Sequence, residues 1–357
     1  AAAALAGLER RAEAVTAYTA ELKEFPAGRY ADAAWFERLR TRAADGDSAG
    51  VLAELAARPD PPAGTADRAW WIAGESALAV SNNALAAQYL RLSAKAPGSV
   101  YAKDATYRLG WLLARTGDLA GAAGTYRTVA EKWPADPLAA RALYAAGEAE
   151  ARAGKGDDAL RDWTDLLAKY PDSSFAPDAL YRKAMEEIRR RDYRQADRTL
   201  GELLRRFPKT ERLAEVLYFH GFTASALGDD PEAEKRFRAS LAAKPAPEFE
   251  REDLLALGGI LKKTGRDAEA AKLFARILGT AAVDRLAADR LAWVADTMLA
   301  AKDFDAALAA AGALAKRNVD AGWNQAAATV EGEAREAKGE TDAALAAYRR
   351  ALAADAR

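Results

Sequence analysis

The sequence predicts an all-α fold, a right-handed superhelix (solenoid) of helix-turn-helix repeats with a 37-residue period. Three observations support this prediction. Prolines recur at that interval: Pro97, Pro134, Pro171, Pro208 and Pro245. A small residue followed four positions later by a large one also recurs: Ala122/Tyr126, Ala159/Trp163, Ala196/Leu200, Ala233/Phe237, Ala270/Phe274 and Ala344/Tyr348. A row of glycines keeps the same spacing: Gly110, Gly147, Gly221, Gly258 and Gly332, with Ala73, Ala184 and Ala295 in the remaining places. One interval held over eight copies indicates one supersecondary unit stacked on itself.

Each period is predicted to form two helices. Between Lys103 and Ala139, apolar residues follow spacings of three and four, which places them on one stripe per helix. Thr116-Gly117-Asp118 separates the stripes, with a glycine where one helix ends and a capping acid where the next begins. Two copies replace the glycine, with Arg191 and Lys302. The second helix then ends at the periodic proline, which cannot continue it.

The small and large residues have a steric explanation. An alanine or glycine where two helices cross lets their axes approach closely, and a large side chain fills the space beside the crossing. A single hairpin has nothing to cover its other apolar face, so each copy depends on its neighbours. The chain has no sustained period-two pattern that would predict strands.

These motifs resemble the tetratricopeptide repeat family. Its signature is a Leu-Gly on the first helix, an Ala-x3-Phe/Tyr on the second and a closing proline. Leu109-Gly110, Ala122-x3-Tyr126 and Pro134 match in register, as do Leu257-Gly258 and Ala270-x3-Phe274. The family period is about 34 residues. We expect the three added residues, such as 137–139 and 174–176, to lengthen the first helix by about one turn.

One copy is similar to a particular branch of that family. Tyr170-Pro171-Asp172-Ser173, followed by Ala176 and Ala179-Leu180-Tyr181, resembles the bacterial cell-envelope proteins of the Tol–Pal coordinator and outer-membrane assembly lipoprotein D type. The resemblance implies a periplasmic or outer-membrane-associated protein, although the repeat itself is equally compatible with the cytoplasm.

The repeats are expected to fill most of the chain. We predict an N-terminal part over residues 1–65, made of an orphan capping helix from Ala12 to Phe25 and a degenerate repeat from Tyr30 to Arg58. Residues 66–357 are predicted to form eight repeats in one continuous solenoid.

Composition excludes several classes of function. The net charge is −1, from 52 basic and 53 acidic residues, so no bulk charge favours nucleic acid as a partner. The chain has no cysteine and no apolar run long enough to span a bilayer. It starts at Ala1 rather than methionine, which we interpret as the result of either a removed targeting segment or a trimmed chain. An upstream lipid anchor would add peripheral membrane association.

The sequence offers little material for catalysis. With one histidine and no cysteine, the usual metal sets cannot be assembled, and we expect no metal, no cofactor and no enzymatic activity. His220 is interpreted as an ordinary helix residue packed against a neighbouring helix. The acidic neighbours Glu148/Glu150 and Glu186/Glu187 are interpreted as solvated helix faces rather than an acid/base couple.

Binding is expected on the first helices, which the family resemblance assigns to the concave side of the superhelix. Equivalent positions stack along one surface of a solenoid. We therefore predict an aromatic strip flanked by guanidinium groups, a composition typical of interface hot spots. Its residues are Trp70, Tyr107, Trp111, Tyr144, Tyr181, Tyr218 and Phe222, with Arg115, Arg152 and Arg189. Leu255, Ala292 and Thr329 replace the tyrosine in later copies, so we expect the groove to be centred on residues 66–250.

Two functions remain open at this point. The first is a non-enzymatic scaffold of the bacterial envelope that holds a peptide segment or a partner protein in its concave groove. The second is the superhelical region of a larger envelope enzyme, such as a lytic transglycosylase, whose catalytic domain lies outside this sequence.

Overall fold

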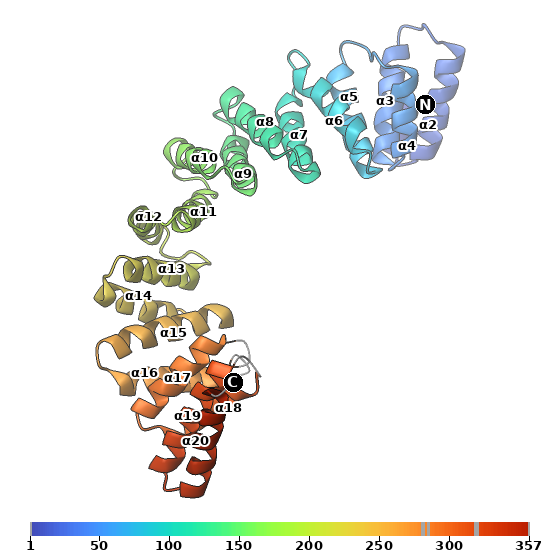
Figure 1. Ribbon diagram of the computed structural model, residues 1–357. Coiled ribbons are helices and arrows are strands. Elements are labelled where there is room, and N and C mark those ends of the chain that lie inside the picture. Colours follow the sequence, from blue (N-terminus) through green and yellow to red (C-terminus); the bar gives the residue numbers. More distant parts are fainter. Residues whose placement is uncertain (1, 280–282, 284–285, 318–320, 356–357) are drawn as a thin grey trace. The chain divides into compact units, whose positions relative to one another are not determined.

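The computed structural model describes residues 2–279, 283, 286–317 and 321–355, and all regular structure in this part of the chain is helical (Figure 1). The helices are α1 (Ala2–Gly7), α2 (Arg11–Glu24), α3 (Ala31–Ala44), α4 (Ser48–Ala57), α5 (Ala66–Ala79), α6 (Asn83–Lys95), α7 (Ala102–Thr116), α8 (Leu119–Lys132), α9 (Pro137–Arg152), α10 (Gly156–Lys169), α11 (Ala176–Arg189), α12 (Tyr193–Arg206), α13 (Leu213–Ala226), α14 (Asp230–Ala242), α15 (Pro247–Lys263), α16 (Asp267–Leu278), α17 (Ala288–Ala300), α18 (Phe304–Ala315), α19 (Ala321–Ala337) and α20 (Thr341–Asp355). The predicted all-α fold of repeated helix pairs is confirmed.

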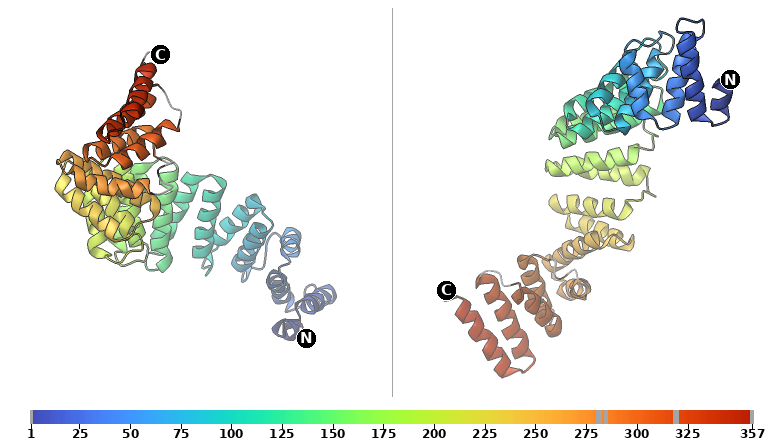
Figure 2. Two further views of the ribbon diagram at one scale, coloured as in Figure 1. Left: turned by 90° about the horizontal axis from the view of Figure 1, so that it is seen from below. Right: turned by 90° about the vertical axis from the view of Figure 1, so that its right-hand side faces the viewer.

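The helices divide into two compact units, Ala1–Glu186 and Glu187–Arg357. Within each unit, consecutive helices pack against one another in chain order, as the two views of Figure 2 also show. The second helix of a hairpin therefore has the first helix of the next hairpin as its neighbour, for example α8 beside α9 and α14 beside α15. Each hairpin covers the apolar face of the one before it, which is the arrangement that a nearest-neighbour solenoid requires.

The glycine row and the row of large residues meet inside each hairpin. The second-helix side chain sixteen positions after the glycine lies directly on it: Tyr126 on Gly110, Trp163 on Gly147, Phe237 on Gly221, Phe274 on Gly258 and Tyr348 on Gly332. A methyl group at any of these glycines would come closer than 3.0 Å to the ring. We call this place the repeat-glycine position. Where alanine occupies it, the partner is smaller, since Ala295 shares its buried cluster with Ala311.

One hairpin is shifted by one residue from the predicted register. Gly74, rather than Ala73, lies under the second-helix residue Leu90. The segment from Leu90 to Gly110 is one residue shorter than the segment from Tyr126 to Gly147, which explains the shift.

The turn inside the hairpin is built the same way in nearly every copy. A residue with positive φ follows the first helix, and the next residue is the N-cap of the second helix. In the Glu187–Arg357 unit the N–H of Asp192 donates to the carbonyl of Glu187 at 2.9 Å, and the Asp192 carboxylate accepts from the N–H of Gln195 at 3.2 Å. The first bond closes a Schellman-type C-cap and the second caps the next helix. Arg191 and Lys302 adopt φ of 63° and 61°, so they keep the geometry without glycine.

The N-terminal helix was predicted to be an orphan, but it is the second helix of a hairpin. The short α1 precedes α2, and Glu9, with φ of 60°, stands before the N-cap residue Arg10 as in the other turns. Ala14 and Tyr18 are buried four residues apart, the same small and large spacing as in the later copies. The prediction missed this hairpin because its first helix has only six residues.

The added residues lengthen the first helix in only some copies. Pro137 begins α9, which has 16 residues, as predicted. In contrast, Ser174 and Phe175 lie in the turn before α11, which has 14 residues. The side chain of Ser173 accepts a hydrogen bond from the N–H of Phe175 at 3.2 Å, and this bond favours the turn over an extra helical turn.

Buried carboxylates join neighbouring hairpins. Glu150 and Asp162 are each 3% exposed, and both bind Arg127 of α8, at 2.7 Å and 2.8 Å. Glu186 and Glu187 are also buried, so the interpretation of Glu150, Glu186 and Glu187 as solvated faces was wrong. A buried carboxylate is stable only with such partners, because its desolvation must be offset.

Replacement of Gly147 by alanine is expected to destabilise the protein by about 1–3 kcal/mol, because the new methyl group overlaps the Trp163 ring. Trp163→Ala is expected to cost about 3–5 kcal/mol through the cavity that it leaves. Chemical denaturation of Gly147→Ala, Trp163→Leu and the double variant Gly147→Ala/Trp163→Leu measures the coupling between the two positions. The double variant should lose less stability than the sum of Gly147→Ala and Trp163→Leu. Additive losses would contradict the contact.

Replacement of Arg191 by glycine is expected to stabilise the protein by about 0.5–1 kcal/mol, because a side chain at positive φ is strained and glycine is not. Gly154→Ala, at the equivalent turn with φ of 75°, is the matched control and should destabilise. Thermal or urea unfolding measures both. A loss of stability in Arg191→Gly would show that the arginine side chain contributes more than its backbone strain costs.

Candidate functional site

The Ala1–Glu186 unit places four of the predicted strip residues at half-buried positions on its first helices. Trp70 and Trp111 lie on α5 and α7, Tyr107 lies on α7, and Tyr144 lies on α9. Because Gly74 takes the repeat-glycine position, the residue three before it is Trp71 rather than Trp70. The Trp71 ring stacks on Tyr101 with centroids 5.9 Å apart. Trp71 and Tyr101 are therefore strip residues that the sequence analysis missed.

Trp111 is held by two arginines. The Cζ atoms of Arg108 and Arg115 lie 4.6 Å and 4.5 Å from its ring centroid. Arg108 also binds both oxygens of Glu75, at 2.8 Å and 3.0 Å, and Arg115 donates to Asn83 Oδ1 at 2.6 Å. The aromatic and guanidinium groups predicted from the sequence are brought together here, and cation–π contacts fix the indole in place.

The two tyrosines of this unit have similar surroundings. The Tyr107 ring lies 5.2 Å from Tyr126, with the Arg141 guanidinium 5.1 Å above it. The Tyr144 ring lies 5.6 Å from Phe175, and Arg182, which binds Glu148 at 3.2 Å, is next to its hydroxyl. Burial raises the pKa of both phenols. Both hydroxyls therefore stay protonated at neutral pH and can donate hydrogen bonds.

The remaining residues of the predicted strip in this unit differ in exposure. Tyr181 on α11 is buried, with 8% of its surface exposed, so it offers a partner little area. Arg152 at the end of α9 is exposed and lies near Glu148, where its positive charge opposes the rise in the pKa of that carboxyl. Of the two, Arg152 is the more accessible group.

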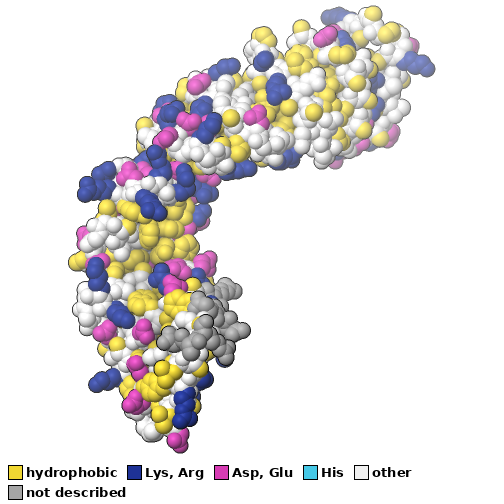
Figure 3. All heavy atoms as spheres, viewed as in Figure 1, with side chains coloured by type: hydrophobic (Ala, Val, Ile, Leu, Met, Phe, Trp, Pro, Cys, Tyr) yellow, Lys and Arg dark blue, Asp and Glu magenta, His cyan; other side chains and the backbone are white. Residues whose placement is uncertain are grey.

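In the Glu187–Arg357 unit, Tyr218 and Phe222 belong to a larger aromatic cluster than predicted. The Tyr218 ring lies 5.0 Å from Phe219 and 5.5 Å from Phe249, and Phe222 meets the edge of Tyr193 at 5.9 Å. Burial raises the pKa of Tyr218 to about 12. Phe222 is 37% exposed. Figure 3 shows hydrophobic side chains gathered on the surface over α13. Arg189, in the last turn of α11, is exposed.

The strip aromatics also join consecutive hairpins. Trp71 and Tyr144 each contact a ring just before the next first helix, Tyr101 and Phe175, and Tyr218 contacts Phe249 in the first turn of α15. These partners lie 30 or 31 residues further along the chain, and they were not among the predicted strip residues. The rings therefore form an ordered face in each unit, with one side packed and one side open.

His220 has a structural position, as the sequence analysis interpreted it. Its side chain is buried, and Nε2 lies 3.3 Å from Asp197 Oδ1, which Arg236 also binds at 2.5 Å. Burial and the positive charge of Arg236 lower the pKa of His220 to about 4. The imidazole is therefore neutral at pH 7.

One buried carboxyl, Asp253 on α15, has a pKa that burial raises towards neutral pH. It is completely buried, and its Oδ2 lies 2.6 Å from the hydroxyl of Ser240, which is also 2.9 Å from the carbonyl of Ala214. The hydroxyl has one proton for these two acceptors, so a protonated Asp253 that donates to Ser240 would satisfy both contacts. Burial raises the pKa of Asp253 to about 7.

Other classes of site find no support in the described residues. Between residues 2 and 355, outside the gaps given above, no group of three or more His, Asp or Glu side chains is arranged to hold a metal ion. Over the same residues, no helix has the length and apolar character needed to cross a membrane.

The geometry defines a repeat protein of stacked helical hairpins with an aromatic face, and comparison with known families agrees. A tetratricopeptide repeat model matches residues 73–137 and 107–174, and a second tetratricopeptide repeat model matches residues 178–210. These matches support the tetratricopeptide repeat family over the central hairpins, where the sequence motifs were quoted. They indicate no catalytic family. Among curated proteins, no sequence match was found.

Solved structures with similar folds include a tetratricopeptide repeat protein from Parabacteroides merdae ATCC 43184, with 15% identity and a TM-score of 0.44, covering 79% of this chain and 99% of its own. PilF of Pseudomonas aeruginosa has 18% identity and a TM-score of 0.45, with coverage of 61% and 92%. A MamA protein has 19% identity and a TM-score of 0.43, with coverage of 50% and 91%.

Replacement of Asp253 by asparagine tests the buried proton. A carboxyl whose pKa rises from 3.8 to about 7 on folding stabilises the protein below the unfolded pKa, and this stability is lost as pH rises towards 7. Asp253→Asn should therefore be roughly 2–4 kcal/mol more stable than the wild type at pH 8 and differ little at pH 4. Urea denaturation of both proteins across this range measures the difference, and a constant difference would contradict the raised pKa.

Proposed function

We propose that this protein is a non-enzymatic scaffold that binds a peptide segment or partner protein on the aromatic face of its first helices. The observation that carries the proposal is Trp111, half-buried and fixed between arginines that are themselves held by Glu75 and Asn83. Aromatic and arginine side chains are enriched at interface hot spots. Tetratricopeptide repeats in general bind protein or peptide partners, and nothing in the matches indicates nucleic acid.

The fixed side chains suit the face to binding. A free side chain must be ordered when a partner binds, at about 0.5–1.5 kcal/mol for each long side chain. Trp111, Tyr107 and Tyr144 are already held by rings and guanidinium groups, so little of this cost remains. The exposed side of each ring can pack on a partner, and the phenol hydroxyls can donate hydrogen bonds.

We place this scaffold in the bacterial envelope, at the periplasmic side or at the outer membrane. Support comes from the Tyr170-Pro171-Asp172-Ser173 motif, which resembles the envelope branch of the family. The Tyr170 hydroxyl donates to the carbonyl of Pro134 at 2.9 Å and so ties the motif to the preceding turn. A lipid-modified cysteine upstream of Ala1 in the full gene would support this location.

The second candidate is the superhelical region of a larger envelope enzyme, such as a lytic transglycosylase. The described residues contribute the repeats alone to this alternative, and the family matches do not favour it over the scaffold. A downstream globular domain with a catalytic glutamate in the full gene would support the enzyme.

Replacement of Tyr144 by alanine tests the binding face. A photoreactive side chain at position 144 first identifies the partner in the native organism, and calorimetry with the purified partner then gives affinities. Tyr144→Ala is expected to weaken binding by about 1–2 kcal/mol, the range of an interface hot spot. Arg152→Ala should have a smaller effect that fades as salt rises, because exposed charges are screened.

Tyr30→Ala is the matched control, because Tyr30 is 64% exposed before α3 and lies outside the strip. Its affinity should equal that of the wild type. Tyr181→Ala should lower stability as well as affinity, since Tyr181 is buried. If folded Tyr144→Ala and Tyr107→Ala variants bind as tightly as the wild type, the partner does not use this face.

A further inference from the structure

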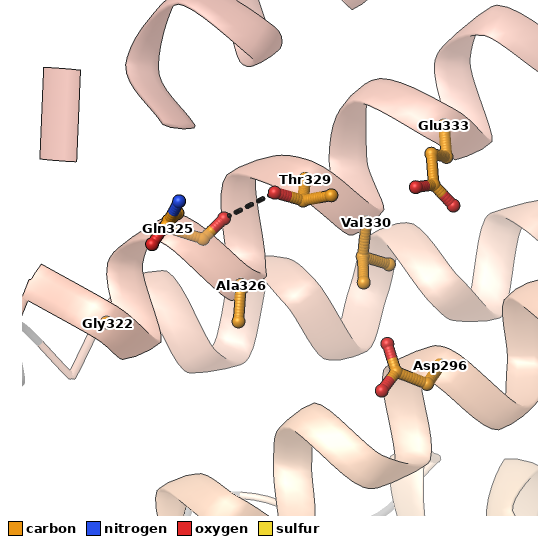
Figure 4. Close-up of a pocket in the computed structure, with 7 residues that line it drawn as sticks. All are labelled: Asp296, Gly322, Gln325, Ala326, Thr329, Val330 and Glu333. Atoms are coloured by element: carbon orange, nitrogen blue, oxygen red, sulfur yellow. Dashed lines mark hydrogen bonds between the residues drawn. The ribbon is translucent and has the colours of Figure 1, made fainter. Parts of the chain in front are cut away.

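A pocket of about 310 Å³ lies on the first-helix face of the Glu187–Arg357 unit, between α17 and α19. The groove predicted from the sequence is centred on residues 66–250, and this pocket lies outside it. The lining residues are Asp296, Gly322, Gln325, Ala326, Thr329, Val330 and Glu333. Figure 4 shows the Asp296 and Glu333 carboxylates on opposite sides of the gap between the two helices. The hydroxyl of Thr329 donates to the carbonyl of Gln325 at 2.9 Å, within the same helix.

The Ala1–Glu186 unit shows what fills the equivalent place elsewhere. Glu75 and Glu148 each follow the repeat-glycine position by one residue. Each binds an arginine two residues before the next repeat-glycine position: Glu75 with Arg108 at 2.8 Å, and Glu148 with Arg182 at 3.2 Å. The acid of one hairpin is therefore neutralised by a cation of the next, and the arginine occupies the space between two first helices.

The pocket keeps the acid of this pair and lacks the cation. Asp296 follows the repeat-glycine position Ala295, but Val330 stands two residues before Gly332, where the arginine would be. Thr329 stands where earlier copies have a tyrosine. Two large side chains are thus replaced by two small ones, and this replacement explains both the volume of the pocket and its excess of negative charge.

Both carboxylates are available to a ligand. Asp296 and Glu333 are exposed, and neither forms an ion pair or a hydrogen bond with another described residue. Glu333 adds a second negative charge at the equivalent position of the next hairpin. The planar guanidinium group, with five N–H donors, matches carboxylates better than an ammonium group does.

We propose that this pocket binds the arginine side chain of a basic segment in a partner protein, in the place that Arg108 and Arg182 occupy in two hairpins of the Ala1–Glu186 unit. The inference rests on the proposed scaffold function and adds a charge requirement for the partner. The aliphatic part of the arginine would lie along Ala326 and Val330, and its guanidinium group would lie between Asp296 and Glu333.

Methyl NMR of the full chain tests the site. The probe is the peptide acetyl-Gly-Gly-Arg-Gly-Gly-amide at low salt, and its control is the same peptide with citrulline, a neutral group of the same shape. The methyl signals of Ala326, Thr329 and Val330 should shift with the arginine peptide and much less with the citrulline peptide. The lysine peptide should bind more weakly than arginine, because the ammonium group cannot span both carboxylates.

Variants test whether the arginine peptide binds at Asp296 and Glu333. Asp296→Asn/Glu333→Gln should weaken binding of the arginine peptide about tenfold, from the loss of two partly screened ion pairs. Asp289→Asn, an exposed carboxylate in the first turn of α17 outside the pocket, should leave binding unchanged. Val330→Arg and Thr329→Tyr restore the residues of the other hairpins and should block the pocket. Two blocking variants keep the test valid if one fails to fold.

Equal shifts with arginine and citrulline peptides would overturn the proposal, as would full affinity in Asp296→Asn/Glu333→Gln. The small probe separates this result from the scaffold hypothesis. If Tyr144→Ala weakens the native partner while the arginine peptide leaves the pocket methyls unmoved, the scaffold stands and the arginine pocket is wrong. If the peptide binds and Tyr144→Ala has no effect, the pocket stands and the aromatic face is wrong.

Discussion

The contact between a repeat glycine and the side chain sixteen residues later sets the distance between the two helices of a hairpin, and the other features depend on it. Because Tyr126, Trp163 or Phe274 rests directly on a glycine, the helix axes are held close and the hairpin has one orientation. Residues just before and after the glycine then project in the same direction in every copy. The aromatic face and the acid–arginine pairs are consequences of this register.

The aromatic face has two roles that cannot be separated by inspection of a single residue. Tyr144 contacts Phe175 of the next hairpin, and Tyr218 contacts Phe249 in the same way. Rings that join hairpins also order the surface that meets a partner. In a solenoid, where each hairpin is stabilised by its neighbours, a ligand that bridges two first helices would also strengthen their coupling.

Much of the fold followed from the sequence, because it depends on spacing within one hairpin. The helix pairs, the turns at Gly117 and Arg191 and the burial of Trp163 are all set by residues fewer than 20 positions apart. The shift at Gly74 was missed because it follows from one absent residue in a link that has no motif of its own. Burial of Glu150 could not be predicted either, since its partner Arg127 belongs to another hairpin.

Prediction of the binding site was limited in the same way, because contacts between hairpins were harder to predict than spacing within one hairpin. The strip residues were found by counting from the glycines, whereas Tyr101, Phe175 and Phe249 contribute across a hairpin boundary. These rings lie two periods apart, with Leu138 and Arg212 at the positions between them, so the aromatic recurs only in alternate copies. The pocket at Asp296 was not predicted, because Thr329 was interpreted only as the loss of a tyrosine. A smaller side chain can instead create a cavity, and whether it does so depends on the neighbouring residue, here Val330.

The turn within each hairpin has a consequence for how such a chain can grow. One residue, such as Asp192, both closes the cap of the first helix and begins the second, so an insertion there would break two helix ends at once. In the link between hairpins, no single residue both ends one helix and begins the next, and the copies differ in length there. Gain or loss of a whole hairpin is therefore easiest at the links, which makes the hairpin, rather than the single helix, the unit that can be exchanged.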